Sequence, residues 1–170
     1  MSSHDVIVVG VGAMGSATCL ALARRGVRVL GIERHGIPHD QGSSHSQSRM
    51  IRCAYYEHPD YVPLLLRAWE LWLELAEESG RNPLFDTGGL YMGPPDSEFV
   101  EASLRAASTY GLEHERLNRS QLHDRFPQFD LPDDYIGMFE TKAGFLVPEW
   151  CIEDQVRLAR AHGADIHEGE

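Results

Sequence analysis

The first 33 positions have a hydrophobic pattern that predicts a β-strand, a helix and a second strand. Residues 6–9 are a continuous run of β-branched side chains, which is typical of a strand buried on both faces of a parallel sheet. Residues 13–25 have helical spacing, and Gly26 is well placed to end that helix. Residues 28–32 predict the second strand. The pattern therefore indicates a βαβ unit and an α/β fold.

Three glycines join the first strand to the helix in the order G-x-G-x-x-G, at Gly10, Gly12 and Gly15. The first allows a tight turn, the second lets the backbone approach a pyrophosphate, and the third lets the helix pack closely on the strand. The helix directs its free N–H groups towards a phosphate. Glu33 follows the second strand, where a carboxylate accepts hydrogen bonds from ribose hydroxyls and repels the 2′-phosphate of NADP. The motif predicts a dinucleotide without distinguishing NAD from FAD.

A long polar passage, residues 34–48, follows this unit and ends in the cluster Ser43 to Ser48. Its hydroxyl and amide groups could serve the phosphates or the ribityl chain of a cofactor, and the alternative interpretation is a solvated surface loop.

Arg49 and Arg52 come next, among apolar neighbours that indicate a segment at least half buried. Buried guanidinium groups need anionic partners. Each arginine is therefore expected to meet a carboxylate, a phosphate or an anionic ligand, and the alternative is pairing with a nearby acid such as Glu57 or Asp60.

The rest of the chain mixes helices and strands. Asp60 can cap a helix that ends at Gly80. Two tryptophans of this helix, Trp69 and Trp72, are interpreted as core residues rather than as a platform for a cofactor. Further elements are expected as a short strand ending at Gly93, a helix at 97–110, a strand at 112–117, a brief helix capped by Ser120, strands at 135–139 and 144–147, a helix at 148–163 and a strand at 164–167. A strand at the end of the sequence suggests a fragment, or a chain that relies on another chain to complete its sheet.

Composition argues against several classes of partner. The 170 residues suit one domain with or without an appended piece, and 26 acidic against 15 basic residues give a net charge of −11, which disfavours nucleic acid and anionic membranes. No segment approaches the roughly 20 apolar residues of a membrane span, and the first strand begins too early for a signal peptide, so we expect a cytoplasmic protein. Cys19, Cys53 and Cys151 form no C-x-x-C pair, so neither a disulfide framework nor a metal site is indicated, and Cys19 is expected in the core.

The chain closely resembles the N-terminal part of the monomeric sarcosine oxidase and N-methyltryptophan oxidase family. The similarity is carried by three stretches, GVGAMGSA, IERHGIPHDQGSSHSQSRMIRCAYYEHPDYVPLLLRAWELW and DDYIGMFETKAGFLVPE. It implies FAD rather than NAD, and an α/β fold in which a Rossmann-type FAD-binding βαβ unit is joined to part of an α+β substrate domain. The fold is expected to be incomplete. The implied domains are 1–80 and 148–170 for the FAD-binding part and 81–147 for the substrate-binding part.

The activity that this resemblance implies is oxidation of a secondary N-methyl amino acid at its C–N bond, with hydrolysis of the imine and reduction of dioxygen to hydrogen peroxide. A monomer is expected for the complete enzyme, and the fragment is expected to be inactive and able to associate with another chain over its open sheet. Two alternatives stay open. One is an oxidase or dehydrogenase acting on another amine, such as a cyclic imino acid, and the other is a non-catalytic remnant that binds a nucleotide or a partner chain.

Residue roles can be carried over from the family onto matching positions. The residues implied for FAD binding are Gly10, Gly12, Ala13, Met14, Gly15, Glu33, Arg34, Ser43, His45, Ser48 and Arg49. Arg49 and His45 are also implied in catalysis beside the flavin, and Arg52 is implied as the group that grips the substrate carboxylate.

Two departures from the family pattern bear on these roles. The family often has His-His-Gly-Asp-Thr where this chain has Ser44 to Ser48, so one histidine is missing and a serine replaces the threonine. The family's cysteine that anchors FAD and its oxygen-activating lysine lie in a C-terminal half that this chain does not reach. Cys53 and Cys151 do not match that anchor.

Overall fold

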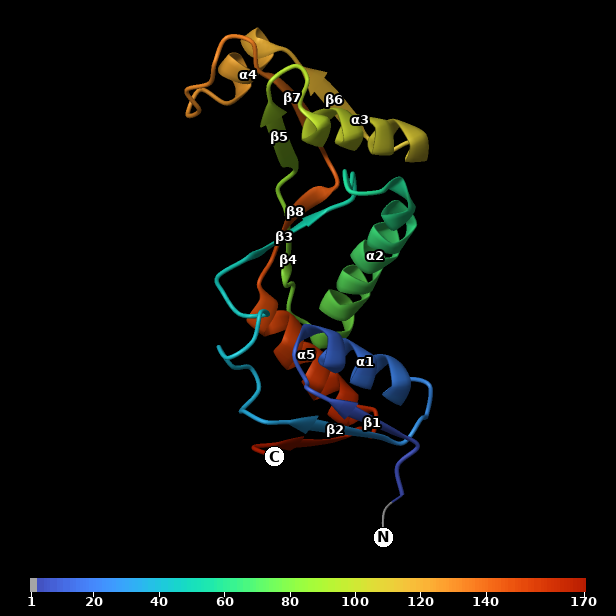
Figure 1. The fold of residues 1–170 in the computed structure, drawn as a ribbon. Helices are drawn as coiled ribbons and strands as arrows, with labels where there is room; N and C mark the ends of the chain where they lie inside the picture. The colour runs from blue at the N-terminus through green and yellow to red at the C-terminus, as the bar shows by residue number, and fades with distance from the viewer. Residues whose placement is uncertain (1–2) are drawn as a thin grey trace. The chain divides into compact units, whose positions relative to one another are not determined.

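A computed structural model describes residues 3–170, which form two compact units. The first consists of residues 3–49, 72–84 and 146–170, and the second of residues 50–71 and 85–145 (Figure 1). The expected α/β fold is confirmed, with one parallel βαβ sheet and additional antiparallel pairing. The assignment of segments 1–80, 81–147 and 148–170 to cofactor and substrate domains stays a prediction.

The first unit is built on a parallel sheet in the order β1-β2-β9. Its strands are β1 (Val6–Val9), β2 (Val29–Glu33) and β9 (Asp165–Glu168). Helices α1 (Ala13–Ala23) and α5 (Pro148–Ala161) pack against each other on one side of the sheet (Figure 1). The predicted strand, helix and strand at the N-terminus are therefore confirmed.

A buried apolar cluster holds these helices to the sheet. Cys19 of α1, Val29 of β2 and Val156 of α5 belong to it, so Cys19 has the core role predicted for it. Trp72 packs against the edge of the cluster and is only partly buried. The prediction that β1 is buried on both faces is wrong for the described residues, because Ile7 is 60% and Val9 83% exposed. The physical reason is that both helices lie on the same side of the sheet.

The second unit contains an antiparallel sheet in the order β5-β7-β6, covered by a helix. These elements are β5 (Gly89–Gly93), β7 (Ile136–Glu140), β6 (His114–Leu117) and α3 (Glu98–Tyr110). Its core includes Tyr91, Val100 and Met138, and Trp69 is buried as predicted. A further sheet, in the order β3-β8-β4, consists of β3 (Arg49–Arg52), β8 (Ala143–Leu146) and β4 (Leu84–Asp86). Strands β3 and β4 were not predicted, because three or four residues show no clear alternation.

Helix ends follow the predictions in part. Gly111 ends α3 with a φ of +63° and Ser97 caps its start, as its sequence indicates. The long helix α2 (Val62–Ser79) is preceded by the 3-10 turn η1 (Pro59–Tyr61), which His58 caps, so the cap predicted at Asp60 is wrong. Helix α4 (Arg119–Arg125) is capped by Asn118 rather than Ser120, because Asn118 and Gln121 form a reciprocal capping box. In the described part of the chain, no helix is both long and apolar enough to cross a membrane.

Candidate functional site

The glycine turn between β1 and α1 gives each glycine a different task. Gly10 has a φ of +86°, which strongly favours glycine. A Cβ on Gly15 would lie 1.9 Å from the carbonyl oxygen of Gly10, so only glycine allows α1 to pack this closely on the turn. A Cβ on Gly12 would meet no atom of the described chain within 4 Å. The tight turn and the close packing predicted from the motif are confirmed, and the backbone at Gly12 is open to approach.

The N-terminus of α1 is suited to an anion. Gly12 is its N-cap residue, no side chain within the described residues caps it, and its first turn carries no acidic residue. The positive end of the helix dipole and the first N–H groups therefore lack a negative partner from the side chains of this turn. A phosphate group would supply that partner.

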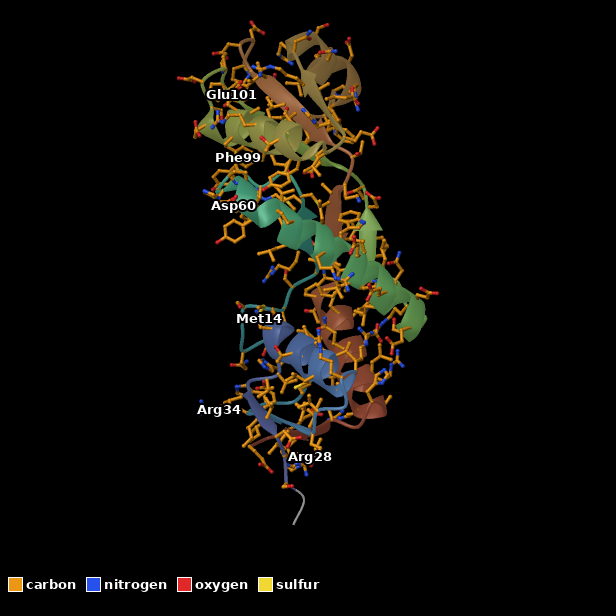
Figure 2. All side chains as sticks on the ribbon, turned by 90° about the vertical axis from the view of Figure 1, so that its right-hand side faces the viewer. Met14, Arg28, Arg34, Asp60, Phe99 and Glu101 are labelled. Carbon is orange, nitrogen blue, oxygen red and sulfur yellow. The ribbon has the colours of Figure 1, made fainter. Side chains whose placement is uncertain are left out.

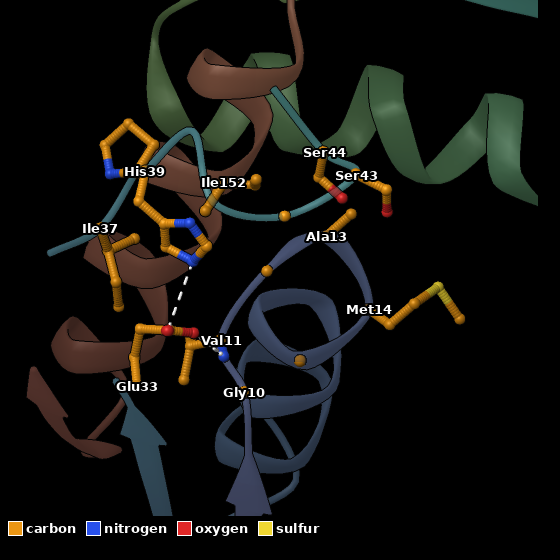
Figure 3. Close-up of a pocket in the computed structure, with 14 residues that line it drawn as sticks. Gly10, Val11, Ala13, Met14, Glu33, Ile37, His39, Ser43, Ser44 and Ile152 are labelled. Atoms are coloured by element: carbon orange, nitrogen blue, oxygen red, sulfur yellow. Dashed lines mark hydrogen bonds and ion pairs between the residues drawn. The ribbon is translucent and has the colours of Figure 1, made fainter. Parts of the chain in front are cut away.

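Glu33 closes the other side of the turn and is only 5% exposed. One carboxylate oxygen accepts a hydrogen bond of 2.7 Å from the Val11 amide, and the other accepts one of 3.1 Å from the His35 amide. His39 Nε2 lies 3.3 Å from that second oxygen (Figure 3). Burial raises the pKa of Glu33, but the amide hydrogen bonds and His39 outweigh burial and hold the pKa below its ordinary value. Glu33 is therefore an ionised acceptor.

A cavity of about 310 Å³ lies in the first unit between the glycine turn, Glu33 and the loop of residues 43–48, called the serine loop below (Figure 3). This volume is at the lower end of the range typical of small-molecule sites, about 300–1,000 Å³. A second, mainly apolar cavity of about 380 Å³ shares Ala13, Met14, Ser43 and Ser44 with it. The two cavities are therefore neighbours. The first lies beside the acceptor Glu33, and the second is lined mainly by apolar side chains.

The serine loop is exposed over most of its length, but hydrogen bonds to its backbone anchor it to the first unit. The Arg49 guanidinium donates hydrogen bonds to the carbonyl oxygens of Ser43 and His45, at 2.5 and 2.9 Å. The Ser46 amide donates one of 2.8 Å to the Glu149 carboxylate. Arg49 therefore shapes the loop through its backbone, although its side chain also lines the second cavity.

The predicted cofactor residues fall into two groups. Those that line the first cavity are Gly10, Gly12, Ala13, Met14, Gly15, Glu33 and Ser43, and Arg49 lines the second. Arg34, His45 and Ser48 are exposed and line neither of these two cavities (Figure 2 shows Arg34 at the surface of the first unit).

Sequence reasoning missed several residues that line the cavities. They are Ile37, Pro38, His39, Ile152, Trp72, Leu146, Pro148, Cys151 and Gln155. His39 follows Glu33 in the polar passage, so its proximity to that acid could have been considered. Ile152 and Gln155 lie on α5, more than 100 residues from the motif, and carry no local signal. Burial raises the pKa of the Cys151 thiol to about 12, so this cysteine is not a reactive thiolate.

Arg52 lies in the second unit, in an aromatic setting. Its guanidinium carbon is 4.7 Å from the ring centre of Tyr55, 5.3 Å from that of Tyr56 and 5.9 Å from that of Phe99. One of its nitrogens lies 3.1 Å from a carboxylate oxygen of Glu57. The pairing with Glu57 that the sequence left open is therefore present. The Arg52 side chain is 19% exposed and that of Glu57 is 36% exposed, so solvent reaches both partners of this ion pair.

The donors and acceptors of the first unit fit the ADP half of FAD. A buried, ionised carboxylate can accept hydrogen bonds from ribose hydroxyls, and an uncapped helix N-terminus beside an open glycine can donate hydrogen bonds to a pyrophosphate. Among residues 3–170, no group of three or more His, Cys, Asp or Glu side chains is arranged to hold a metal ion.

Comparison with known proteins agrees with this geometry. The chain is 44% identical to monomeric sarcosine oxidase from Streptomyces avermitilis, over 97% of this chain and 43% of that protein. It is 42% identical to N-methyl-L-tryptophan oxidase from Salmonella dublin, over 94% of this chain and 43% of that protein. The chain thus spans less than half the length of these curated relatives.

Solved structures show the same fold. The open form of NikD, described as an unusual amino acid oxidase essential for nikkomycin biosynthesis, matches with a TM-score of 0.85 and 29% identity, over 99% of this chain and 44% of that one. L-proline dehydrogenase from P. horikoshii matches with a TM-score of 0.84, but at 22% identity, so that it supports the fold alone. The family model described as FAD dependent oxidoreductase (DAO) matches residues 5–170. Since this match covers almost the whole chain, the protein belongs to the DAO family of FAD-dependent oxidoreductases.

Proposed function

We propose that this chain is the N-terminal part of an FAD-dependent oxidase that acts on a secondary N-methyl amino acid. The observation that carries the proposal is identity of 42–44%, over 94–97% of the chain, to two oxidases whose names specify sarcosine and N-methyl-L-tryptophan. Both compounds are amino acids with a methylated nitrogen and a free carboxylate. The proposed substrate class is therefore amino acids with a methylated nitrogen and a free carboxylate.

In this proposal, the first unit binds the ADP half of FAD. Glu33 accepts hydrogen bonds from ribose hydroxyls, while the Val11 and His35 amides keep its carboxylate ionised and oriented. The N-terminus of α1 and the open backbone at Gly12 receive the pyrophosphate. Bound FAD would supply the electron acceptor for oxidation of the C–N bond.

Arg49 and the serine loop are proposed to form part of the wall on the flavin side. Arg49 holds the carbonyl oxygens of Ser43 and His45, which fixes the loop that lines both cavities. A catalytic role for Arg49 and His45 beside the flavin remains part of the proposal. His45 is exposed, and its backbone carbonyl is the atom that Arg49 contacts.

Arg52 is proposed to bind the substrate carboxylate. The rings of Tyr55, Tyr56 and Phe99 hold the guanidinium by cation–π contacts that do not consume its hydrogen-bond donors. Glu57 accepts from one terminal guanidinium nitrogen at 3.1 Å, and a substrate carboxylate of the same charge could replace it.

The proposal is tested with the purified full-length protein in air. Hydrogen peroxide should appear with sarcosine or N-methyl-L-tryptophan and should not appear with glycine, which lacks the N-methyl group. Peroxide from proline but from neither N-methyl compound would favour the alternative of a cyclic imino acid oxidase. A colourless protein that gains no visible absorption with added FAD would refute a flavoenzyme role.

A further inference from the structure

Glu140 is a charged side chain in the interior of the second unit that the proposed reaction does not use. It ends β7 and is 0% exposed. Burying a carboxylate is strongly unfavourable unless hydrogen bonds and nearby positive charge compensate. The contacts of Glu140 should therefore show what compensates for its burial.

The contacts of Glu140 converge on the residues that directly follow Arg52. One carboxylate oxygen accepts hydrogen bonds from the Cys53 amide at 2.9 Å and from the Ala54 amide at 2.8 Å. The other accepts one of 2.6 Å from the Tyr91 hydroxyl, which belongs to the neighbouring strand β5. Cys53 and Ala54 are themselves fully buried. The carboxylate thus fastens the turn after β3 to the antiparallel sheet.

This attachment fixes the point from which the Arg52 side chain extends. The two amides belong to the residues one and two positions after Arg52, and the rings of Tyr55 and Tyr56 that contact its guanidinium follow directly. Phe99, the third ring, lies 5.3 Å from the ring of Tyr91, whose hydroxyl holds Glu140. One buried carboxylate therefore contacts both the turn that leads to Tyr55 and Tyr56 and the tyrosine that packs against Phe99, and these three rings surround the Arg52 guanidinium.

We propose that Glu140 is a positioning residue for Arg52: it holds the Cys53 and Ala54 amides and so sets the guanidinium where it can receive the substrate carboxylate. This inference rests on the proposed role of Arg52. In this inference, Glu140 influences Arg52 through the positions of its two acceptor oxygens rather than through its charge.

The two conservative variants of Glu140 separate placement from charge. Glu140→Gln keeps the length and one carbonyl acceptor but loses the charge, whereas Glu140→Asp keeps the charge but withdraws the acceptors by one methylene. In the full-length holoenzyme, Glu140→Asp should raise the KM for sarcosine by about tenfold or more, as expected when buried amide N–H groups lose their acceptor, with a much smaller change in kcat. Glu140→Gln should stay much closer to the parent. The reverse order of the two variants would overturn the assignment to placement.

A control and a double variant exclude a general loss of structure. Asp154 is a buried carboxylate of the first unit that pairs with Arg81 at 2.8 Å, and Asp154→Asn should leave the KM for sarcosine unchanged. If Glu140 acts through Arg52, then Glu140→Asp should add no further increase in KM once Arg52→Ala is present. Additive effects of the two substitutions would contradict the proposal.

Hydrogen exchange keeps this inference separate from the proposed function. Glu140→Asp should accelerate amide exchange in a peptide spanning residues 52–56 without changing exchange in β2. If the parent protein oxidises no N-methyl amino acid, the proposed function fails, and the exchange result alone decides whether Glu140 holds this turn. Unchanged exchange at residues 52–56 would overturn the inference even in an active enzyme.

Discussion

Gly12 and Gly15 lie three residues apart in the same turn, and adding one methyl group should have opposite consequences at the two positions. At Gly15 a Cβ would lie 1.9 Å from the Gly10 carbonyl oxygen and 3.3 Å from Val8 Cγ1. Since the nearer atom is backbone, α1 must move away from β1. A Cβ at Gly12 would have no atom within 4 Å apart from its local backbone, and the φ of −76° is open to alanine.

The magnitudes follow from these distances. Overpacking of this kind costs about 1–3 kcal/mol or more, so Gly15→Ala should clearly lower the melting temperature. Gly12→Ala changes an N-cap from glycine to alanine and should cost at most about 1 kcal/mol. Its methyl group points into the space proposed for the pyrophosphate, so FAD should bind at least about tenfold more weakly, which corresponds to about 1.4 kcal/mol.

The assay uses the cofactor-free full-length protein. Thermal unfolding reports the stability of each variant, and titration with FAD followed by flavin fluorescence reports affinity. Equal losses of melting temperature in both variants would refute the distinction between packing and binding. Parent-like FAD affinity in Gly12→Ala would refute the location proposed for the pyrophosphate.

Three other predictions concern charged side chains. Arg52→Ala should raise the KM for an N-methyl amino acid by about 10- to 100-fold, since charge-assisted hydrogen bonds are worth about 1.5–3 kcal/mol, and an unchanged KM would give Arg52 a structural role only. Glu57→Gln removes the competing carboxylate 3.1 Å from Arg52 and should lower that KM by up to about fivefold, as expected for an exposed ion pair, whereas a higher KM would contradict exchange between Glu57 and substrate. Because the pKa of Glu33 is held below its ordinary value of 4.5, its ionised form stabilises the fold above that pH, and this contribution is lost as the pH falls through the lowered pKa. Unfolding temperatures measured from pH 6 to pH 3 should therefore fall more steeply for the parent than for Glu33→Gln, and parallel curves would contradict this sign.

The N-terminal βαβ unit was predictable because its signals are local. A β-branched run, a glycine motif, a helical stretch and a terminal acid occur in sequence, and each limits the backbone independently of the rest of the chain. The structure gives a local reason for two of the glycines: Gly10 has a positive φ, and the turn backbone leaves no room for a Cβ on Gly15.

Other features depend on contacts between distant residues, and local patterns do not contain them. Glu140 meets the Cys53 and Ala54 amides across 87 and 86 positions, so nothing near Glu140 in the sequence indicates its partners. The exposure of Val9 depends on which side of the sheet the helices occupy, although its β-branched run looks fully buried. Local patterns identified Arg52 and Glu57 as possible partners, but the three rings around the guanidinium include Phe99, which α3 supplies.

In the proposed function, FAD bound by this protein accepts electrons from a secondary N-methyl amino acid. Sarcosine or N-methyl-L-tryptophan can be added to the full-length holoenzyme without oxygen while the visible absorption of the flavin is followed. We expect one of these compounds to bleach the absorption, air to restore it, and glycine to leave it unchanged. A flavin spectrum that neither N-methyl amino acid alters would contradict the proposed function.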